Sequence, residues 1–500
     1  MKKTTHKRGL ALLLSLMLLL SMLPTAAFAA GNTIYTDMSY KGVSDGSEAK
    51  PYAKFEDALN RAVDGDTIII KGKAFANAKE ESGVTPLVIS KRVTITGEND
   101  TPGALYVRAG GIMLGADVTM RDVELNLANK YHNAIFVNGY RFTAENVTRG
   151  TGSREVHLFA GGIGTGTQVT ATMPTSGSGA VLALTNSTFG SIYAGGVASA
   201  FAGDVAVTAS GCKLGAVYGS GAAERAPDGN WFDTTEPPAP EVNAAYSVTG
   251  PVNIAVDGAS TVGGAYTVSV NGNGSSNTSL TINTAVESKK LNLSDLKSLT
   301  INGGTAAVAA INETADVTLN NNATISFAGS KTIHNLFGSG KIILGKEDKL
   351  TITGAFNGTH DFETTGGTNG QSGLAATGHT YITAASGNAT VHFTPYESQK
   401  DFLTLIKNTE NGGLAWVTSN APESKAYVEK LKIDSVSKNI TKTVEEINDE
   451  TNGGAEIKVL IGEQDSLQEV PLTIMANGQN AVPDADSYVV GSMRITAIDG

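Results

Sequence analysis

"GAVLALTNSTFGSIYAGGVAS", residues 179–199, contains a pattern that returns twice further along the chain. The stretch "GDVAVTASGCKLGAVYGSGAAE" begins at Gly203, and "GPVNIAVDGASTVGGAYTVSV" begins at Gly250. Each copy alternates apolar with small or polar residues over a few positions and then stops at Gly, Asn, Ser or Asp, as short strands that end in turns do. A repeat with a period of about 24 residues predicts a solenoid in which each copy forms one coil.

The same period extends toward the N-terminus. Val93, Val118 and Phe142 open the triplets VTI, VTM and FTA, and their spacing matches the step from Gly179 to Gly203 to within one residue. This period suits a coil of three short strands, because the spaced leucines of a strand-and-helix repeat are absent. Stacked coils place equivalent strands about 4.8 Å apart, and glycines allow tight corners between strands. The sequence therefore predicts an all-β parallel solenoid.

One period is lengthened by an insertion. The step from Gly203 to Gly250 is nearly twice the step from Gly179 to Gly203, and the extra stretch "RAPDGNWFDTTEPPAPEVNAA" is rich in proline and polar residues. We expect a projecting loop over residues 225–247.

A short amphipathic stretch precedes the first strand. Phe55, Ala58, Leu59 and Ala62 recur at the helical spacing i, i+3, i+4 and i+7, just before the β-branched run at 67–70. The first coil of a solenoid has an open edge that would pair with another chain. We expect this helix to cap that edge.

The repeats become irregular toward the C-terminus. "LTINTA" at 280, "LTINGG" at 299, "VTLNNN" at 317 and "LTITG" at 350 are unevenly spaced, which predicts shorter coils or a changed cross-section. From about residue 393 the glycine-rich pattern stops and Lys and Glu return. We therefore expect a parallel β-helix over 30–392 and a small α+β or β-sandwich module over 393–500, of which this chain holds the whole or a part.

Residues 1–29 read as a secretory signal. Four basic residues precede an apolar run from Leu10 to Leu23 and the small-residue stretch Ala27-Phe28-Ala29. No later apolar run is long enough to span a bilayer. We expect a secreted or cell-wall location.

Charge and cysteine content narrow the partners. Removing the signal moves the formal net charge from −11 to −15, which disfavours nucleic acid because phosphate binding needs a basic face. Cys212 is the only cysteine, so no internal disulfide forms. We expect a monomer or part of a longer surface assembly.

The stretch "DGSEAKPYAKFEDALNRAVDGDTIII" at 45–70, followed by "VTITG" and "VTMRDVEL", resembles right-handed parallel β-helix proteins of the pectin-lyase-like superfamily. The glycine-rich "LFAGG", "IYAGG" and "VYGSG" are similar to stretches in adhesin-like surface proteins of Gram-positive bacteria. The resemblance covers residues 33–390. It implies the fold, but the same scaffold hosts enzymes, adhesins and passive stalks.

Candidate catalytic residues are few. An enzyme of this superfamily would need clustered carboxylates for acid and base chemistry, and the Asp-Asp, Gly-His-Gly and Arg-Ile-Lys motifs expected of its polygalacturonase-like group are absent. Arg121 and Asp122 stand one period before Glu145 and Asn146. Stacking predicts an ion pair between Arg121 and Glu145, and we favour a structural role for it. We assign no catalytic residue.

No metal or cofactor site is predicted. The six histidines of the mature chain share no zinc-ligand spacing. "GGIGTG" at 161–166 lacks the helix and lysine of a phosphate-binding loop and the aspartate of a calcium-binding repeat, so we interpret it as a turn insertion.

Aromatic residues supply the remaining candidates. Phe159, Tyr193, Tyr218 and Tyr266 occupy similar places in successive copies, as an internal ladder filling the coil or as an exposed stripe that stacks on sugars. Trp231 and Phe232 lie in the insertion and must pack back or bind a partner. We predict these two as the binding residues, with glycans or host and matrix proteins as partners. An adhesin-like or structural role is favoured; the alternatives are a polysaccharide lyase or glycoside hydrolase, and a passive spacer.

Overall fold

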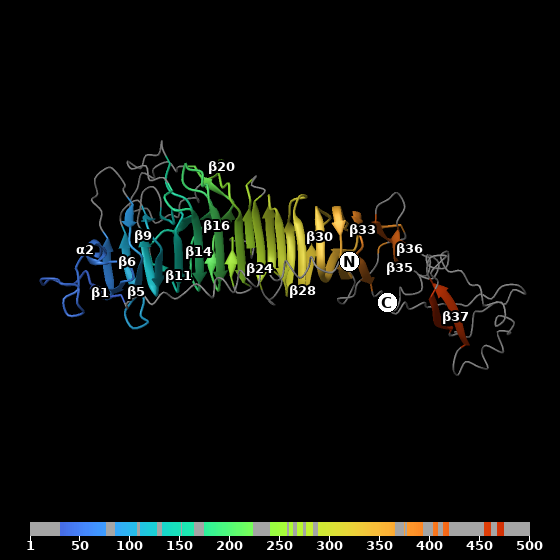
Figure 1. Cartoon of the computed structure of the whole chain (residues 1–500), viewed down its shortest axis with the longest axis horizontal. Coiled ribbons are helices and arrows are strands. Elements are labelled where there is room, and N and C mark those ends of the chain that lie inside the picture. Colours follow the sequence, from blue (N-terminus) through green and yellow to red (C-terminus); the bar gives the residue numbers. More distant parts are fainter. Residues whose placement is uncertain are drawn as a thin grey trace, which may run out of the picture. The chain divides into compact units, whose positions relative to one another are not determined.

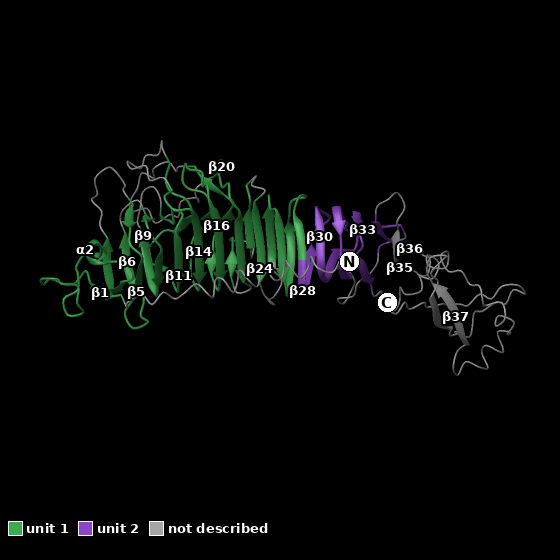
Figure 2. Ribbon diagram, in the orientation of Figure 1, with its two compact units in different colours: residues 1–318 green, residues 319–500 purple. Residues whose placement is uncertain are grey.

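The structure is a computed structural model of the 500-residue chain. It describes residues 31–393, apart from 77–85, 108–110, 128–132, 152, 165–174, 224–240, 258–259, 264–267, 274–276, 284–288, 366–374 and 376–377, and four later strands within 404–408, 414–419, 455–461 and 468–474. The chain forms two compact units, residues 1–318 and 319–500, which Figure 2 colours separately. The predicted boundary between 392 and 393 remains a prediction.

The first unit is a parallel β-helix (Figure 1). One face of its coil is a ladder of strands that pair in parallel from each rung to the next. In order these strands are β1 (Thr33–Thr36), β2 (Thr67–Ile70), β5 (Val93–Gly97), β8 (Val118–Arg121), β11 (Arg141–Glu145), β14 (Gly179–Thr185), β16 (Asp204–Ser210), β21 (Val252–Asp257), β24 (Thr278–Asn283) and β26 (Ser298–Asn302). We call this ladder the first face.

Two further faces close the coil. The second face is a parallel ladder of β4 (Leu87–Ile89), β7 (Ile112–Leu114), β10 (Ala134–Phe136), β13 (His157–Phe159), β15 (Ile192–Tyr193), β18 (Val217–Tyr218), β23 (Val268–Asn271), β25 (Lys289–Ser294) and β27 (Thr305–Ala310). The third face begins with β3 (Lys73–Ala76), β6 (Gly103–Val107), β9 (Val123–Leu127) and β12 (Thr148–Arg149). β17 (Lys213–Leu214) and β22 (Thr261–Val262) form a later pair.

Alternation along each strand separates the core from the surface. In β5 of the first face, Val93 and Ile95 are buried. The alternate residues Thr94 and Thr96 are partly exposed. Threonine occupies the same outward position in eight of the ten rungs: Thr33, Thr67, Thr94, Thr119, Thr143, Thr208, Thr281 and Thr300. β-branched residues suit such half-buried positions on a sheet.

A left-handed residue turns the chain at the end of several first-face strands. Asp122, Asn146 and Asn186 adopt φ values of 50°, 55° and 48°, and Gly211 has φ 63° at the equivalent place. The Asn146 side-chain amide donates to Asp122 Oδ1 at 2.9 Å, so these corners also stack on one another. Asp, Asn and Gly are the residues that tolerate this backbone conformation best.

The first coil is capped as the sequence predicts, by two devices together. Helix α2 (Phe55–Arg61) buries Phe55, Ala58 and Leu59 and contacts β1 and β3. Lys91 Nζ donates to the Leu59 carbonyl at 3.0 Å, satisfying a group that the helix end leaves free. The edge of β1 is covered by residues 46–52, because Tyr35 exchanges main-chain hydrogen bonds with both ends of that segment.

The register confirms most predicted repeats and corrects one. Val93 pairs with Val118, and Val118 with Phe142, at the predicted steps. Aligning Gly179 with Gly203 predicts that Val181 pairs with Val205. In the structure Val181 pairs with Ala206, and Ala180 pairs with Val205, so the predicted alignment is wrong by one residue. A shift by one position would place the outward Val181 beside the buried Val205, so burial fixes the register.

The coils then shorten, as the spacing predicts. Ile254 pairs with Leu280, and Leu280 pairs with Leu299 on the next rung. The second step is shorter along the chain than the first. β28 (Asp316–Phe327) crosses from the first unit into the second.

The second unit contains two parallel ladders and several antiparallel pairs. One ladder is β29 (Lys331–Ile333), β31 (Leu350–Phe356) and β33 (Thr380–Gly387); the other is β30 (Asn335–Gly345), β32 (Thr359–Thr365) and β34 (Thr390–Phe393). The antiparallel strands are β35 (Thr404–Asn408), β36 (Leu414–Ser419), β37 (Ala455–Ile461) and β38 (Gln468–Ile474). In the part of the chain that the structure describes, no helix has the length and apolar character needed to cross a membrane.

Candidate functional site

The predicted binding residues Trp231 and Phe232 lie outside the described residues. The two ends of their insertion are described. β19 (Ser220–Ala222) leads into it and β20 (Val242–Ser247) leads out, and the two strands pair antiparallel, with Ala222 opposite Val242. The Ala223 amide donates to the Glu241 carbonyl at 2.8 Å. The insertion therefore leaves and rejoins the coil at one closed neck, near the label β20 in Figure 1.

An aromatic stack lies beneath this neck. The rings of Phe136 and Phe159 are 5.3 Å apart between centroids, those of Phe159 and Tyr193 are 4.6 Å apart, and those of Tyr193 and Tyr218 are 5.1 Å apart. The interplanar angles are 22°, 8° and 22°, so all three pairs stack face to face. The register of the parallel strands places these four rings one rung apart.

The stack points away from the coil interior. Its row begins at Val88, which is 40% exposed, and continues past Tyr218 to the partly exposed Asn271. The neighbouring row holds Ile192 and Val217, both buried, and continues through apolar residues into the later rungs. Because the two rows project from opposite sides of the same strands, the second row fills the coil and the aromatic row lies outside it.

A second layer of chain covers the stack. Ile163, Val197 and Ala222 form parallel bridges with one another and pack with Phe136, Phe159 and Tyr193 in one buried cluster. These three residues follow the glycine-rich stretches "AGG", "AGG" and "GSG", which turn the chain back over the aromatic residue just before them. We call residues 160–164, 194–198 and 219–223 the glycine-turn layer. The aromatic ladder is thus fully buried from Phe136 to Tyr193 and partly buried at Tyr218, yet it does not fill the coil.

The layer requires glycine because its backbones touch. A Cβ atom on Gly196 would lie 2.3 Å from the Gly162 carbonyl oxygen, and one on Gly221 would lie 2.2 Å from the Gly196 carbonyl oxygen. Neither distance can be relieved by rotating a side chain, since the opposing atoms are main chain. The repeated glycines set the close packing of one turn on the next.

Burial raises the pKa values of the two tyrosines in the stack. Desolvation raises the pKa of Tyr193 above its usual range, and the neighbouring Tyr218 and Glu155 add to that rise. Burial also raises the pKa of Tyr218. Both phenols are therefore neutral at physiological pH and act as aromatic surfaces with a polar edge.

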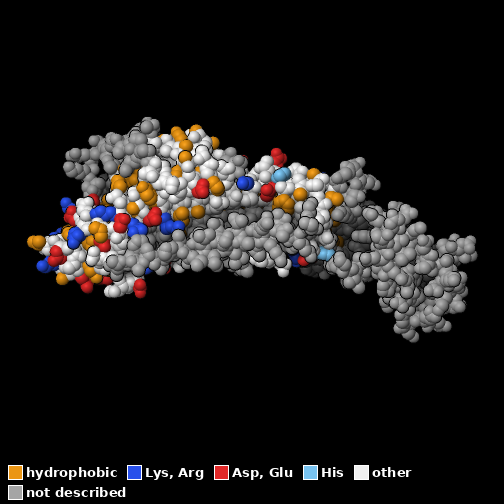
Figure 3. All heavy atoms as spheres, viewed as in Figure 1, with side chains coloured by type: hydrophobic (Ala, Val, Ile, Leu, Met, Phe, Trp, Pro, Cys, Tyr) orange, Lys and Arg blue, Asp and Glu red, His pale blue; other side chains and the backbone are white. Residues whose placement is uncertain are grey.

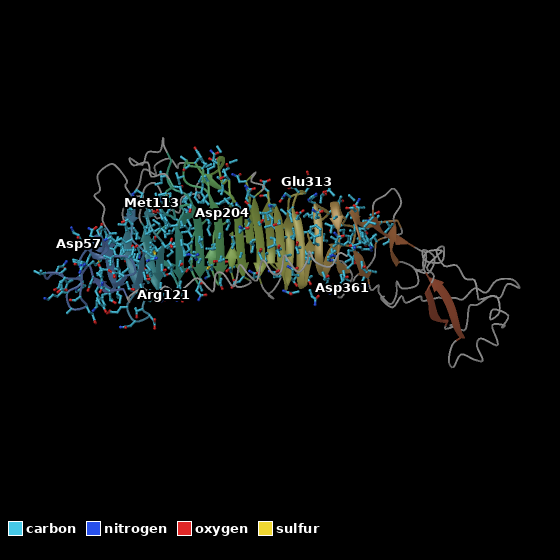
Figure 4. The ribbon with its side chains drawn as sticks, in the orientation of Figure 1. Asp57, Met113, Arg121, Asp204, Glu313 and Asp361 are labelled. Atoms are coloured by element: carbon cyan, nitrogen blue, oxygen red, sulfur yellow. The ribbon has the colours of Figure 1, made fainter. Side chains whose placement is uncertain are left out.

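The predicted ion pair is present on the first face. Arg121 Nε lies 2.7 Å from Glu145 Oε2, and these two residues are cross-strand neighbours. Their side chains are 52% and 43% exposed, so solvent weakens the attraction. Figure 4 shows Arg121 on the side of the coil away from Met113, the first buried residue of the aromatic row. Arg121 is therefore remote from the aromatic stack.

Asp257 organises a corner of the coil. Its carboxylate accepts hydrogen bonds from Ser210 Oγ at 2.6 Å, from the Gly211 amide at 3.2 Å and from the Ser260 hydroxyl at 2.9 Å. Burial works against ionisation, but these hydrogen bonds outweigh it and hold the pKa of Asp257 below its usual range. The carboxylate is thereby committed to structure.

Charged side chains of both signs are interspersed on the N-terminal part of the face in Figure 3.

Within the described ranges, no group of three or more His, Cys, Asp or Glu side chains is placed to hold a metal ion. Of "GGIGTG", residues 161–164 belong to the glycine-turn layer, and Thr165 and Gly166 lie outside the described residues, as does Tyr266. The glycine-turn layer that covers the aromatic stack was not predicted from the sequence.

Comparison with known proteins found no matching family model, curated protein or solved structure.

Proposed function

We propose that the chain is a secreted, adhesin-like binding protein of the bacterial surface, which holds its partner through the insertion at 225–247. The carrying observation is the closed neck of that insertion, where β19 pairs with β20 directly over the buried aromatic stack. A loop on a rigid platform presents its side chains at a defined place, which favours recognition. Trp231 and Phe232 would provide the contact surface, since aromatic residues contribute strongly to binding.

The expected partner is a glycan or a host or matrix protein. The signal at 1–29 and the acidic mature chain support an extracellular setting. The pectin-lyase-like likeness of the sequence supports a scaffold that presents loops from its side faces.

The test is a glycan and matrix-protein array probed with the mature protein, residues 30–500. The matched variant replaces Trp231 and Phe232 together by alanine, and the control replaces Val43, which is 89% exposed, by alanine. We expect specific spots that disappear only in the double variant. Spots that persist in the double variant would contradict the role of the insertion, and an array without any specific spot would favour a passive spacer.

Incubation with a polysaccharide panel tests the enzymatic alternative. Release of reducing or unsaturated ends that is lost in Arg121→Ala or Asp122→Ala would overturn the noncatalytic proposal.

A further inference from the structure

The aromatic row ends abruptly at Tyr218. Tyr193 stacks on one face of its ring, and the residue opposite Tyr218 in the next rung is Asn271, whose side chain is much smaller than a ring. Tyr193 is fully buried, whereas Tyr218 is only partly buried. The stack of rings therefore stops at this position, where the partly exposed Tyr218 ring could stack with another flat apolar surface.

Two asparagine amide groups lie on the rung after Tyr218. The Asn271 carboxamide oxygen accepts a hydrogen bond from the Asn273 main-chain amide at 2.7 Å, and the Asn273 side-chain amide donates to Ser220 Oγ at 2.6 Å. Each bond orients its carboxamide and uses only one of its two polar ends. They leave the NH₂ group of Asn271, opposite Tyr218 in the register, as a donor, and the side-chain carbonyl oxygen of Asn273, whose amide reaches Ser220, as an acceptor.

The position is held rigidly. Asn273 adopts a left-handed φ of 51°, which fixes the turn that follows β23. Gly219 packs so closely on the next rung that a Cβ there would lie 2.6 Å from the Gly272 carbonyl oxygen. The Gly219 amide also donates to the Asn271 carbonyl at 2.8 Å, so main-chain contacts hold the rungs of Tyr218 and Asn271 together. Such preorganisation lowers the cost of binding.

We infer that Tyr218, Asn271 and Asn273 form a binding site for one ring of a neutral oligosaccharide. One face of a pyranose ring carries C–H groups and suits stacking on an aromatic ring, while its equatorial hydroxyls pair with a neighbouring donor and acceptor. The three side chains are uncharged, which favours a neutral sugar over an acidic one. The inference rests on the proposed function, since it names the chemical class of a partner held beside the same insertion.

The test uses the mature protein and five hexasaccharides, built from β-1,4-linked glucose, N-acetylglucosamine, xylose, mannose and galactose, in isothermal titration calorimetry. We expect at least one to bind, with about tenfold weaker binding in Tyr218→Ala and in Asn271→Ala and nearly unchanged binding in Tyr218→Phe. Tyr106→Ala is the control, because Tyr106 is also partly buried but lies on the third face. Asn271→Ala tests the site even if Tyr218→Ala disturbs the glycine-turn layer.

Two outcomes would overturn the inference. One is that none of the five hexasaccharides binds. The other is that Tyr218→Ala and Asn271→Ala bind as the unaltered protein does. Array spots that need Trp231 and Phe232 but survive Tyr218→Ala would uphold the proposed function and reject this site, whereas hexasaccharide binding that needs only Tyr218 and Asn271 would do the reverse.

Discussion

Replacing Tyr193 by alanine should loosen the glycine-turn layer and leave the coil beneath it folded. The Tyr193 side chain is fully buried and stacks on both Phe159 and Tyr218. Removing a buried aromatic side chain costs about 3–5 kcal/mol, of which two ring contacts account for about 1–3 kcal/mol. The loss falls on the layer, because Ile192 and not Tyr193 faces the interior of the coil.

Hydrogen exchange read by mass spectrometry localises this loss. The Ala194 amide donates to the Tyr218 carbonyl, and the Ala198 amide donates to the Ala222 carbonyl, both at 2.9 Å. A local loss of about 3 kcal/mol corresponds to exchange about 10²-fold faster at such amides. Tyr193→Phe, which keeps the ring, should exchange nearly as the unaltered protein does.

The contrast is Ile192→Ala, which should accelerate exchange in β14 and β16 as well. The reasoning is refuted if Tyr193→Ala leaves residues 194–198 and 219–222 as protected as before, or if it loosens β14 and β16 as much as Ile192→Ala does.

Three further predictions concern the cap, the layer and the second unit. Phe55→Asp should expose the first coil and give concentration-dependent oligomers in light scattering, whereas Val63→Asp, at a site 53% exposed, should stay as the unaltered protein; equal behaviour of the two would contradict the capping role. Gly196→Ala should lower the thermal midpoint because of its clash with the Gly162 carbonyl, and Gly179→Ala, whose Cβ would approach nothing closer than 3.5 Å, should not; a tolerated Gly196→Ala would count against the close turn packing. Burial lowers the pKa of the His360 imidazole, so this residue costs no stability above its unfolded-state pKa near 6.5, and the free energy of unfolding falls as the pH drops below that value. The loss between pH 7 and pH 5 is at most about 2 kcal/mol. Hydrogen exchange in β32 should become faster over this range, and exchange that does not change with pH would reject the prediction.

The sequence was enough to predict the coil, because the repeat period, the turn residues and the alternation all agree. The cap followed from the spacing of Phe55, Ala58 and Leu59, which the structure buries as predicted. The predicted register of Val181 was wrong by one residue, because aligning Gly179 with Gly203 ignored which side chains face inward. Alternation of burial, not the position of a glycine, decides register.

The side on which the aromatic row lies could not be read from the pattern alone. Leu158 and Phe159 are both apolar and both buried, so local alternation gives no indication of which one faces the coil. The indication lies further along the stack, where the row of Phe159 reaches Asn271 and the row of Leu158 reaches Val270. Finding it requires the register across the insertion, which depends on long-range pairing. The binding role of Trp231 and Phe232 stays a prediction.

Thiol crosslinking tests the stacked coil most directly. In a Cys212→Ala background, Val181→Cys combined with Ala206→Cys places two outward thiols on adjacent strands about 5 Å apart, whereas Val181→Cys combined with Val205→Cys places them on opposite sides of the sheet. A short bifunctional thiol reagent should link the first pair quickly and the second hardly at all. Equal linking of both pairs, or of neither, would contradict the parallel, in-register stacking of successive coils.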